Sequence, residues 1–353
     1  MARRRNEADP NVVFLVAKLF FDGMRVREIA QQVNAELRPA KRLNREAVYP
    51  LLAEARRLKY VRLAPPLEGR LAEEVARKFE FDAKHITVVR TQGKHLNEFV
   101  AARAAELTLD LIRDISGSSG KPVGLGLGPG RATLDFSRYL GELLRSEIDV
   151  PPVKLFAICA GCPAKSPEYS STSFFNLFPP NMVAERVGLF AETVLPSGEF
   201  EQIKQRPGVA EAFESRDQVS IVVTSMGDFH DDDDLLSMFL ARAGTKLQAL
   251  RDRGWVGSVQ YRPYSSTGPI KESPEEMRAV TLFELEDFVR MADSKNKYVV
   301  LVARQCGLCG KTRATALRPL LTVPELRVWS ELVMDEATAR DLLRDAPAAP
   351  AAT

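Results

Sequence analysis

The sequence predicts an α/β protein with a small helical head of winged helix-turn-helix layout, followed by a larger Rossmann-like domain on a parallel sheet. Helical spacing of apolar residues in the first 65 positions predicts the head, and alternating β-rich and helical patterns from about residue 85 predict the sheet. A change in charge supports the division: residues 1–65 hold 14 Lys and Arg against seven Asp and Glu, and the remainder holds 35 against 40. The boundaries we expect are 1–64 for the head, 65–84 for a linker helix, 85–345 for the α/β domain and 346–353 for a disordered tail.

Three helices account for the head. Residues 11–23 and 25–33 place apolar side chains on one side, and Gly23 suits the end of the first helix. The third helix is expected over 44–63, with Asn44 as its N-cap and with Pro50 either near its start or at a kink. The stretch YVRL at its end is expected to form the short strand of a wing.

The excess of positive charge in the head indicates a polyanionic partner. In a winged helix-turn-helix the third helix reads base edges in the major groove, and basic side chains around it bind phosphates. The candidate base-reading residues are Arg45, Glu46 and Tyr49, and the candidate phosphate-binding residues are Lys41, Arg42, Arg56 and Arg57. The alternative is a three-helix protein-interaction module, because trihelical patterns are common.

Four turns follow β-rich runs in the body and should meet at one edge of a parallel sheet. They are GLGPGRAT (126–133), CAGC (159–162), TSMGD (224–228) and CGLCGK (306–311). Ligands bind at the carboxyl ends of strands in open α/β sheets. The backbone N–H groups of GLGPGRAT could hold an anion, with Arg131 and Thr133 as further donors, although it lacks the Gly-Lys-Ser/Thr ending of a Walker A loop. The alternative is a tight strand-to-helix turn and nothing more.

Taken in order, these segments resemble the SorC family of bacterial transcriptional regulators over nearly the whole chain. The head is similar in AKLFFDGMRVREIAQQV and REAVYPLLAEARRLKYVRL. The body is similar in GLGLGPGRAT, in GWVGSVQYRPYSSTG, and in ARQCGLCGKTRATALRPLL with the closing VMDEATARDLL. The family joins a helix-turn-helix to a sugar-binding domain related to phosphosugar isomerases.

The resemblance implies a phosphorylated sugar as effector. Its residues here would be Gly126, Gly128, Gly130, Arg131 and Thr133 as the phosphate cradle, Lys311 as a charge partner, and Gly161 and Gly227 in the pocket wall. The chain departs from the family in the longer loop NAELRPAKRLN, in Pro129, and in YSSTG, where Ser265 or Ser266 stands in place of a usual acidic residue. These departures bear on which sugar is bound and on whether a sugar is bound at all.

All four cysteines of the chain lie in two C-x-x-C pairs, Cys159 with Cys162 and Cys306 with Cys309. Two such pairs can supply the four thiolates of a tetrahedral metal site if their loops meet at the sheet edge. Zinc, an iron–sulfur cluster and reversible dithiol oxidation are each compatible with the pattern. The alternative is that the thiols pack as small apolar groups. His230 beside Asp231–Asp234 is better explained as a solvated helix start than as a second metal site.

The function predicted from the sequence is a cytoplasmic, oligomeric, DNA-binding regulator whose second domain senses a small effector. No apolar run approaches the roughly 20 residues of a membrane span, and no secretory signal follows the basic start. One alternative is a regulator that senses metal, an iron–sulfur cluster or thiol state instead of a sugar. A second alternative is a phosphosugar isomerase-like enzyme, for which Asp228 and Asp335 are the candidate bases; the prediction is that the chain is not an enzyme.

Overall fold

The computed structural model of the chain divides into two compact units, Met1–Ala64 and Pro65–Thr353. The structure describes residues 8–58, 60–61, 64–91, 97–117, 120–147, 150–161, 166–229, 234–244 and 247–344. Each unit has its own apolar core, and each is described here by itself.

The first unit is a bundle of three helices, α1 (Pro10–Phe21), α2 (Val26–Glu36) and α3 (Arg45–Arg57). A row of apolar side chains from each helix forms the core of this unit, because apolar residues recur at helical spacing, as in Val12 and Val16 of α1. Gly23 follows α1 with a φ of +89°, a conformation that favours glycine and ends the helix. The three predicted helices are therefore confirmed, with the third ending at Arg57.

The start of α3 and the loop before it are held by two asparagines. The Asn44 side chain accepts a hydrogen bond from the Ala47 N–H at 2.8 Å, as predicted for an N-cap. The Asn34 carboxamide pairs with both the N–H and the C=O of Leu43, each at 2.8 Å, and so ties the long loop back to α2. Pro50 lies inside α3. The predicted wing strand YVRL covers residues 60–63, of which 62 and 63 lie outside the described residues.

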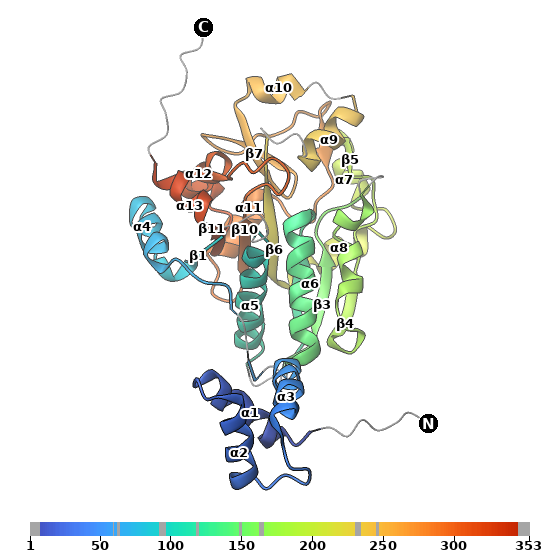
Figure 1. Cartoon of the computed structure of the whole chain (residues 1–353). Coiled ribbons are helices and arrows are strands. Elements are labelled where there is room, and N and C mark those ends of the chain that lie inside the picture. Colours follow the sequence, from blue (N-terminus) through green and yellow to red (C-terminus); the bar gives the residue numbers. More distant parts are fainter. Residues whose placement is uncertain are drawn as a thin grey trace. The chain divides into compact units, whose positions relative to one another are not determined.

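The second unit is built on a mostly parallel sheet with the strand order β1-β11-β10-β6-β2-β3-β4 (Figure 1). From β2 the chain crosses to β3 and β4 on one side, and it later returns to β6, β10 and β11 on the other side. The chain thus changes direction between β2 and β6, which makes this the topological switch point of the sheet. The strands are β1 (Ile86–Val89), β2 (Val123–Leu127), β3 (Val153–Ala157), β4 (Val183–Val187), β6 (Val219–Asp228), β10 (Tyr298–Ala303) and β11 (Glu331–Asp335).

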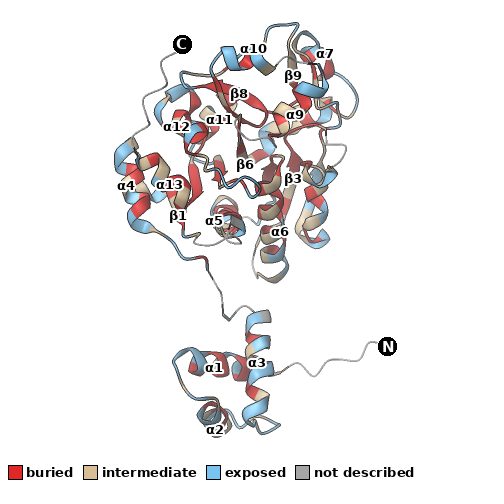
Figure 2. Cartoon of the chain, turned by 45° about the horizontal axis from the view of Figure 1, so that its top comes forward, coloured by how far each residue is buried: buried red, intermediate tan, exposed pale blue. Residues whose placement is uncertain are grey.

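The central strands are buried on both faces, as near-continuous apolar runs such as VVLVA in β10 predict (Figure 2). Helices α5 (Asn97–Ser116) and α6 (Arg131–Ser146) lie side by side in front of β6 (Figure 1). The other helices of eight or more residues in the described part of this unit are α4 (Gly69–Phe79), α9 (Leu235–Arg242), α11 (Leu285–Ala292), α12 (Ala314–Thr322) and α13 (Glu336–Leu343).

The helix expected to act as a linker, α4, packs into the second unit. Its Leu71, Ala72 and Val75 belong to the main core, and the helix contacts β1 and α13. It is therefore part of the α/β domain.

A hairpin of β7 (Trp255–Val259) and β8 (Arg262–Ser265) extends the sheet by pairing with the far end of β6 in the antiparallel sense. A separate antiparallel pair joins β5 (Val194–Pro196) to β9 (Met277–Ala279). The remaining short helices are α7 (Phe200–Ile203), α8 (Ala210–Ser215) and α10 (Leu247–Asp252). Within the described residues, every helix is too short or too polar to cross a membrane.

Candidate functional site

A cavity of about 110 Å³ opens at the carboxyl ends of β2, β6 and β10, at the topological switch point of the sheet. Its wall comes from five segments that are far apart in the sequence. These are 129–132 after β2, 224–227 in β6, 258–261 in the β7–β8 hairpin, 302–307 at the end of β10, and 234–235 at the start of α9, joined by Tyr169 and Arg313. The cavity lies where sheet topology places ligands in α/β proteins.

The amino end of α6 forms one side of the cavity. Gly130 precedes the helix with a φ of +106°, donates its N–H to the Tyr169 carbonyl at 2.9 Å, and leaves the helix without a side-chain cap. The first N–H groups of a helix have no acceptor within the helix, and the helix dipole places positive charge at this end. Gly130, Arg131 and Ala132 all line the cavity, so the amino end of α6 lies at an anion-binding position in its wall.

The charged side chains of the wall favour an anionic ligand. Among the described lining residues, three arginines (Arg131, Arg304 and Arg313) oppose a single carboxylate, Asp234. The Arg131 guanidinium lies over the Tyr169 ring, 5.3 Å from its centroid, and Arg304 pairs with Asp135 at 2.8 Å. Asp234 caps α9 by accepting hydrogen bonds from the Ser237 N–H at 2.8 Å and the Ser237 hydroxyl at 2.9 Å. These hydrogen bonds stabilise the Asp234 carboxylate without removing its charge, and the three arginines still outnumber Asp234 and Asp135.

The structure brings only part of the predicted effector site together. Gly130, Arg131 and Gly227 line the cavity. The other predicted residues lie outside the wall: Gly126 and Thr133 are packed behind it, Gly161 lies against Thr193, and Lys311 lies in a neighbouring hollow with Asp228 and Arg340. Gly128 lies directly behind the wall, where a Cβ would come within 2.3 Å of the Gln260 Nε2.

Several lining residues were not predicted. Ser258, Gln260 and Tyr261 reach the cavity from the β7–β8 hairpin, and Arg304 and Arg313 reach it from either side of the CGLCGK turn. Ser258, which directly follows Val256–Gly257, lines the cavity. Ser265, which the sequence suggested in place of a usual acidic residue, instead hydrogen-bonds to Thr267 and Gly268 just after β8. In the sequence, the hairpin could have been recognised from Gln260 and Tyr261, which stand between two stretches of strand pattern.

The cysteines occupy different environments. Cys159 is buried and donates its S–H to the Gln260 Oε1 at 2.7 Å, and burial raises the pKa of this thiol well above its ordinary range. Cys306 is buried in the cavity wall, and Cys309 is exposed. Cys162, like His230, lies outside the described residues. Among the residues that the structure does describe, no three His, Cys, Asp or Glu side chains come together as a metal site. A shared metal or cluster at the four cysteines stays a prediction.

The two candidate bases of an isomerase lie outside the cavity wall. Asp335 caps α13, accepting hydrogen bonds from the N–H and the hydroxyl of Thr338, each at 2.8 Å, and from the Gln305 N–H at 2.7 Å. Burial raises the pKa of the Asp335 carboxyl, and the hydrogen bonds from Thr338 and Gln305 act in the opposite direction. Asp228 lines the neighbouring hollow with Lys311. Asp335 is therefore placed to hold the loop that carries Gln305, which itself lines the cavity.

The candidate DNA-binding residues of the first unit lie on its surface. Lys41 and Arg42 are exposed in the loop before α3. Arg45, Tyr49 and Arg56 are exposed along one face of α3, with Glu46 beside them, while Val48, Leu51 and Ala55 face the core. Tyr49 is 53% exposed although it is a large aromatic residue. Arg57 ends the helix, and its side chain lies outside the described part of the chain.

Residues 66–344 match the family model Sugar-bind, described as "Putative sugar-binding domain". The chain belongs to the Sugar-bind family. Its resemblance to the SorC regulators is thereby confirmed. No curated protein matches this Sugar-bind chain.

Several solved structures share the fold of this Sugar-bind chain. The full-length sorbitol operon regulator SorC from Klebsiella pneumoniae is 17% identical, with 96% of this chain and 100% of that chain covered and a TM-score of 0.64. A DeoR family transcriptional regulator from Listeria monocytogenes is 16% identical over 77% of this chain and 98% of its own, with a TM-score of 0.57. A transcriptional regulator from Streptococcus pneumoniae TIGR4 is 16% identical over 78% of this chain and 95% of its own, with a TM-score of 0.58. The predicted α/β class is confirmed by this shared fold.

Proposed function

We propose that the chain is a DNA-binding transcriptional regulator whose cavity in the second unit binds a phosphorylated sugar or a related small anion. The observation that carries the effector part is the cavity at the switch point, where the uncapped amino end of α6 lies among three arginines. A phosphate group fits this chemistry, because helix N–H groups and guanidinium groups both donate hydrogen bonds to its oxygens. Membership of the Sugar-bind family supports a sugar as the remainder of the ligand.

The DNA-binding part rests on the exposed face of α3. Arg45, Tyr49 and Arg56 present donors and an aromatic ring along a helix whose opposite side is apolar, and Lys41 and Arg42 stand next to it. This is the arrangement expected of a recognition helix with phosphate-binding neighbours. The regulators that share the fold, including the SorC regulator that covers the first unit as well, support the same role. Such a role would place the protein in the cytoplasm as an oligomer on its operator.

Substitutions on α3 test this role. We expect the full chain to select a duplex from fragmented genomic DNA, and its affinity to fall as salt rises, because phosphate contacts release counterions. Arg45→Ala should weaken binding to the selected duplex by about 10-fold or more, if Arg45 makes a base contact of about 1–3 kcal/mol. Fluorescence anisotropy measures both effects.

The control is Arg206→Ala, an exposed arginine of the second unit with the same change of charge. Its affinity for the duplex should stay within about twofold of the parent chain, since most surface substitutions have small effects. The proposal fails if no duplex is selected, or if Arg45→Ala and Arg206→Ala bind equally well.

A further inference from the structure

The turn of the β7–β8 hairpin is strained and faces the cavity. Its two residues, Gln260 and Tyr261, have φ values of +53° and +59°. A two-residue hairpin turn of this type needs positive φ at both positions and is normally made by Asn-Gly or Asp-Gly. Here both side chains are large, both are buried, and both line the cavity. Strain that is retained in a cavity wall points to a role for the side chains that it presents.

One end of the Gln260 carboxamide is hydrogen-bonded, and the other end has no hydrogen-bond partner among the described residues. Its Oε1 accepts the Cys159 S–H, but its Nε2 is buried with no hydrogen-bond acceptor among the described residues. The residue is only 3% exposed, and it lines the cavity. A buried N–H without an acceptor costs free energy, so native proteins seldom keep one unless something else supplies the acceptor. The occupant of the cavity can supply it.

Cys159 fixes which end of the Gln260 amide is left without a hydrogen-bond partner. The thiol lies at the end of the buried segment after β3, and burial keeps it protonated and able to donate. Sulfur is a weak acceptor, whereas a carbonyl oxygen is a good one. The amide oxygen therefore turns toward Cys159, and the NH₂ group is left on the other side.

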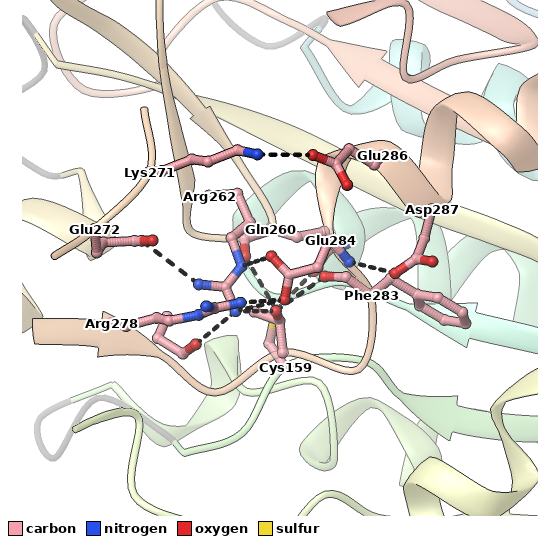
Figure 3. A network of polar contacts seen from close by, with 12 residues as sticks. Cys159, Gln260, Arg262, Lys271, Glu272, Arg278, Phe283, Glu284, Glu286 and Asp287 are labelled. Atoms are coloured by element: carbon pink, nitrogen blue, oxygen red, sulfur yellow. Dashed lines mark hydrogen bonds and ion pairs between the residues drawn. The ribbon is translucent and has the colours of Figure 1, made fainter. Parts of the chain in front are cut away.

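Neighbouring residues hold this arrangement in place. Gly128 provides the room, since a Cβ there would collide with the Gln260 Nε2. Arg262, which follows the turn, is anchored by hydrogen bonds to the Ala279 carbonyl at 2.9 Å and the Thr281 hydroxyl at 2.7 Å, and by an ion pair with Glu284 (Figure 3). Figure 3 also shows Cys159 and Gln260 beside this anchored guanidinium. Arg262 thus anchors the carboxyl-terminal side of the turn, and Gly128 leaves room for the Gln260 amide.

We propose that Gln260 is a specificity-determining residue, which donates a hydrogen bond from Nε2 to a hydroxyl or carbonyl oxygen of the sugar part of the effector. Cys159 is its positioning residue. This inference rests on the proposed function, in which Arg131 and the amino end of α6 bind the phosphate. Gln260 then binds the uncharged sugar part of the ligand.

The test compares hexose monophosphates with inorganic phosphate as probes, using isothermal titration calorimetry on the full chain and on Gln260→Leu. Loss of one buried hydrogen bond is expected to weaken binding of the hexose monophosphate by about 10-fold or more. Inorganic phosphate, which has no sugar part, should bind the two proteins within about twofold of each other.

Monodeoxy analogues of the bound hexose monophosphate locate the acceptor. The analogue that lacks it should bind the parent chain more weakly, but it should lose nothing further in Gln260→Leu, since the two changes remove the same contact. If Gln260→Leu binds the hexose monophosphate as tightly as the parent chain, the inference is wrong and the proposed function stands. If the parent chain binds no hexose monophosphate in the panel, the proposed effector class itself is wrong.

Two substitutions of Cys159 test its positioning role. Cys159→Ser keeps a donor for the Gln260 oxygen and should retain affinity for the hexose monophosphate within about threefold. Cys159→Ala removes the donor and should approach the affinity of Gln260→Leu. A readout without ligand is the infrared S–H stretch of Cys159, which should move to higher frequency in Gln260→Leu as the hydrogen bond is lost. Equal affinities of Cys159→Ala and the parent chain, or an unmoved S–H band, would overturn this role.

Discussion

Arg262→Leu is expected to lower the free energy of unfolding of the second unit by about 3 kcal/mol or more, the range for removing one partner of a buried ion pair. The Arg262 side chain is 4% exposed and pairs with Glu284 at 3.0 Å and with Glu272 at 3.5 Å (Figure 3). Without it, the nearly buried Glu272 carboxylate and the Ala279 carbonyl lose their donor. Urea unfolding followed by tryptophan fluorescence measures the change, because both tryptophans, Trp255 and Trp329, are buried in this unit.

A surface ion pair provides the control for Arg262→Leu. Arg290 pairs with Asp287 on α11, but its side chain is 69% exposed. Arg290→Leu should therefore change the free energy of unfolding by less than about 1 kcal/mol. Equal losses in the two variants would show that burial of Arg262 does not anchor the hairpin.

Arg131→Gln is expected to weaken binding of a hexose monophosphate by about 10-fold to 100-fold, because a hydrogen bond to a charged group contributes about 1.5–3 kcal/mol. Arg131 is the first residue of α6, lines the cavity, and lies over the Tyr169 ring. Inorganic phosphate should lose affinity by a similar factor, in contrast to the Gln260→Leu variant. Isothermal titration calorimetry measures both ligands.

The control lies on the same helix. Arg145→Gln makes the same change of charge in the last turn of α6, where Arg145 donates to the Leu177 carbonyl at 2.9 Å. It should leave both affinities within about twofold of the parent chain. If Arg145→Gln and Arg131→Gln weaken binding equally, net charge rather than the cavity governs the affinity.

The sequence was sufficient for the fold because local patterns and the global fold agree. Helical spacing located α1, α2 and α3, and continuous apolar runs located β6 and β10, since buried parallel strands need no polar face. The turn before α6 was also predictable, because Gly130 and Arg131 stand where a strand pattern changes into a helix pattern.

The cavity could be predicted only in part because strand order brings its segments together. Gln260, Arg304 and Arg313 meet Arg131 only when β6 and β10 lie beside β2, and spacing in the sequence does not specify that order. Cys159 shows the same limit. Its C-x-x-C spacing is typical of a metal ligand, but the structure turns the thiol toward Gln260.

The most direct measurement is the affinity of the full chain for its selected DNA duplex, followed by fluorescence anisotropy with and without each member of a panel of hexose monophosphates. An effector acts by binding the DNA-binding and non-binding states with different affinities, so it must shift the DNA affinity. The account predicts that at least one hexose monophosphate changes the dissociation constant for DNA by about fivefold or more, that the sugar without phosphate does not, and that Arg131→Gln abolishes the change. A DNA affinity that no hexose monophosphate alters, or that the free sugar alters equally, would contradict it.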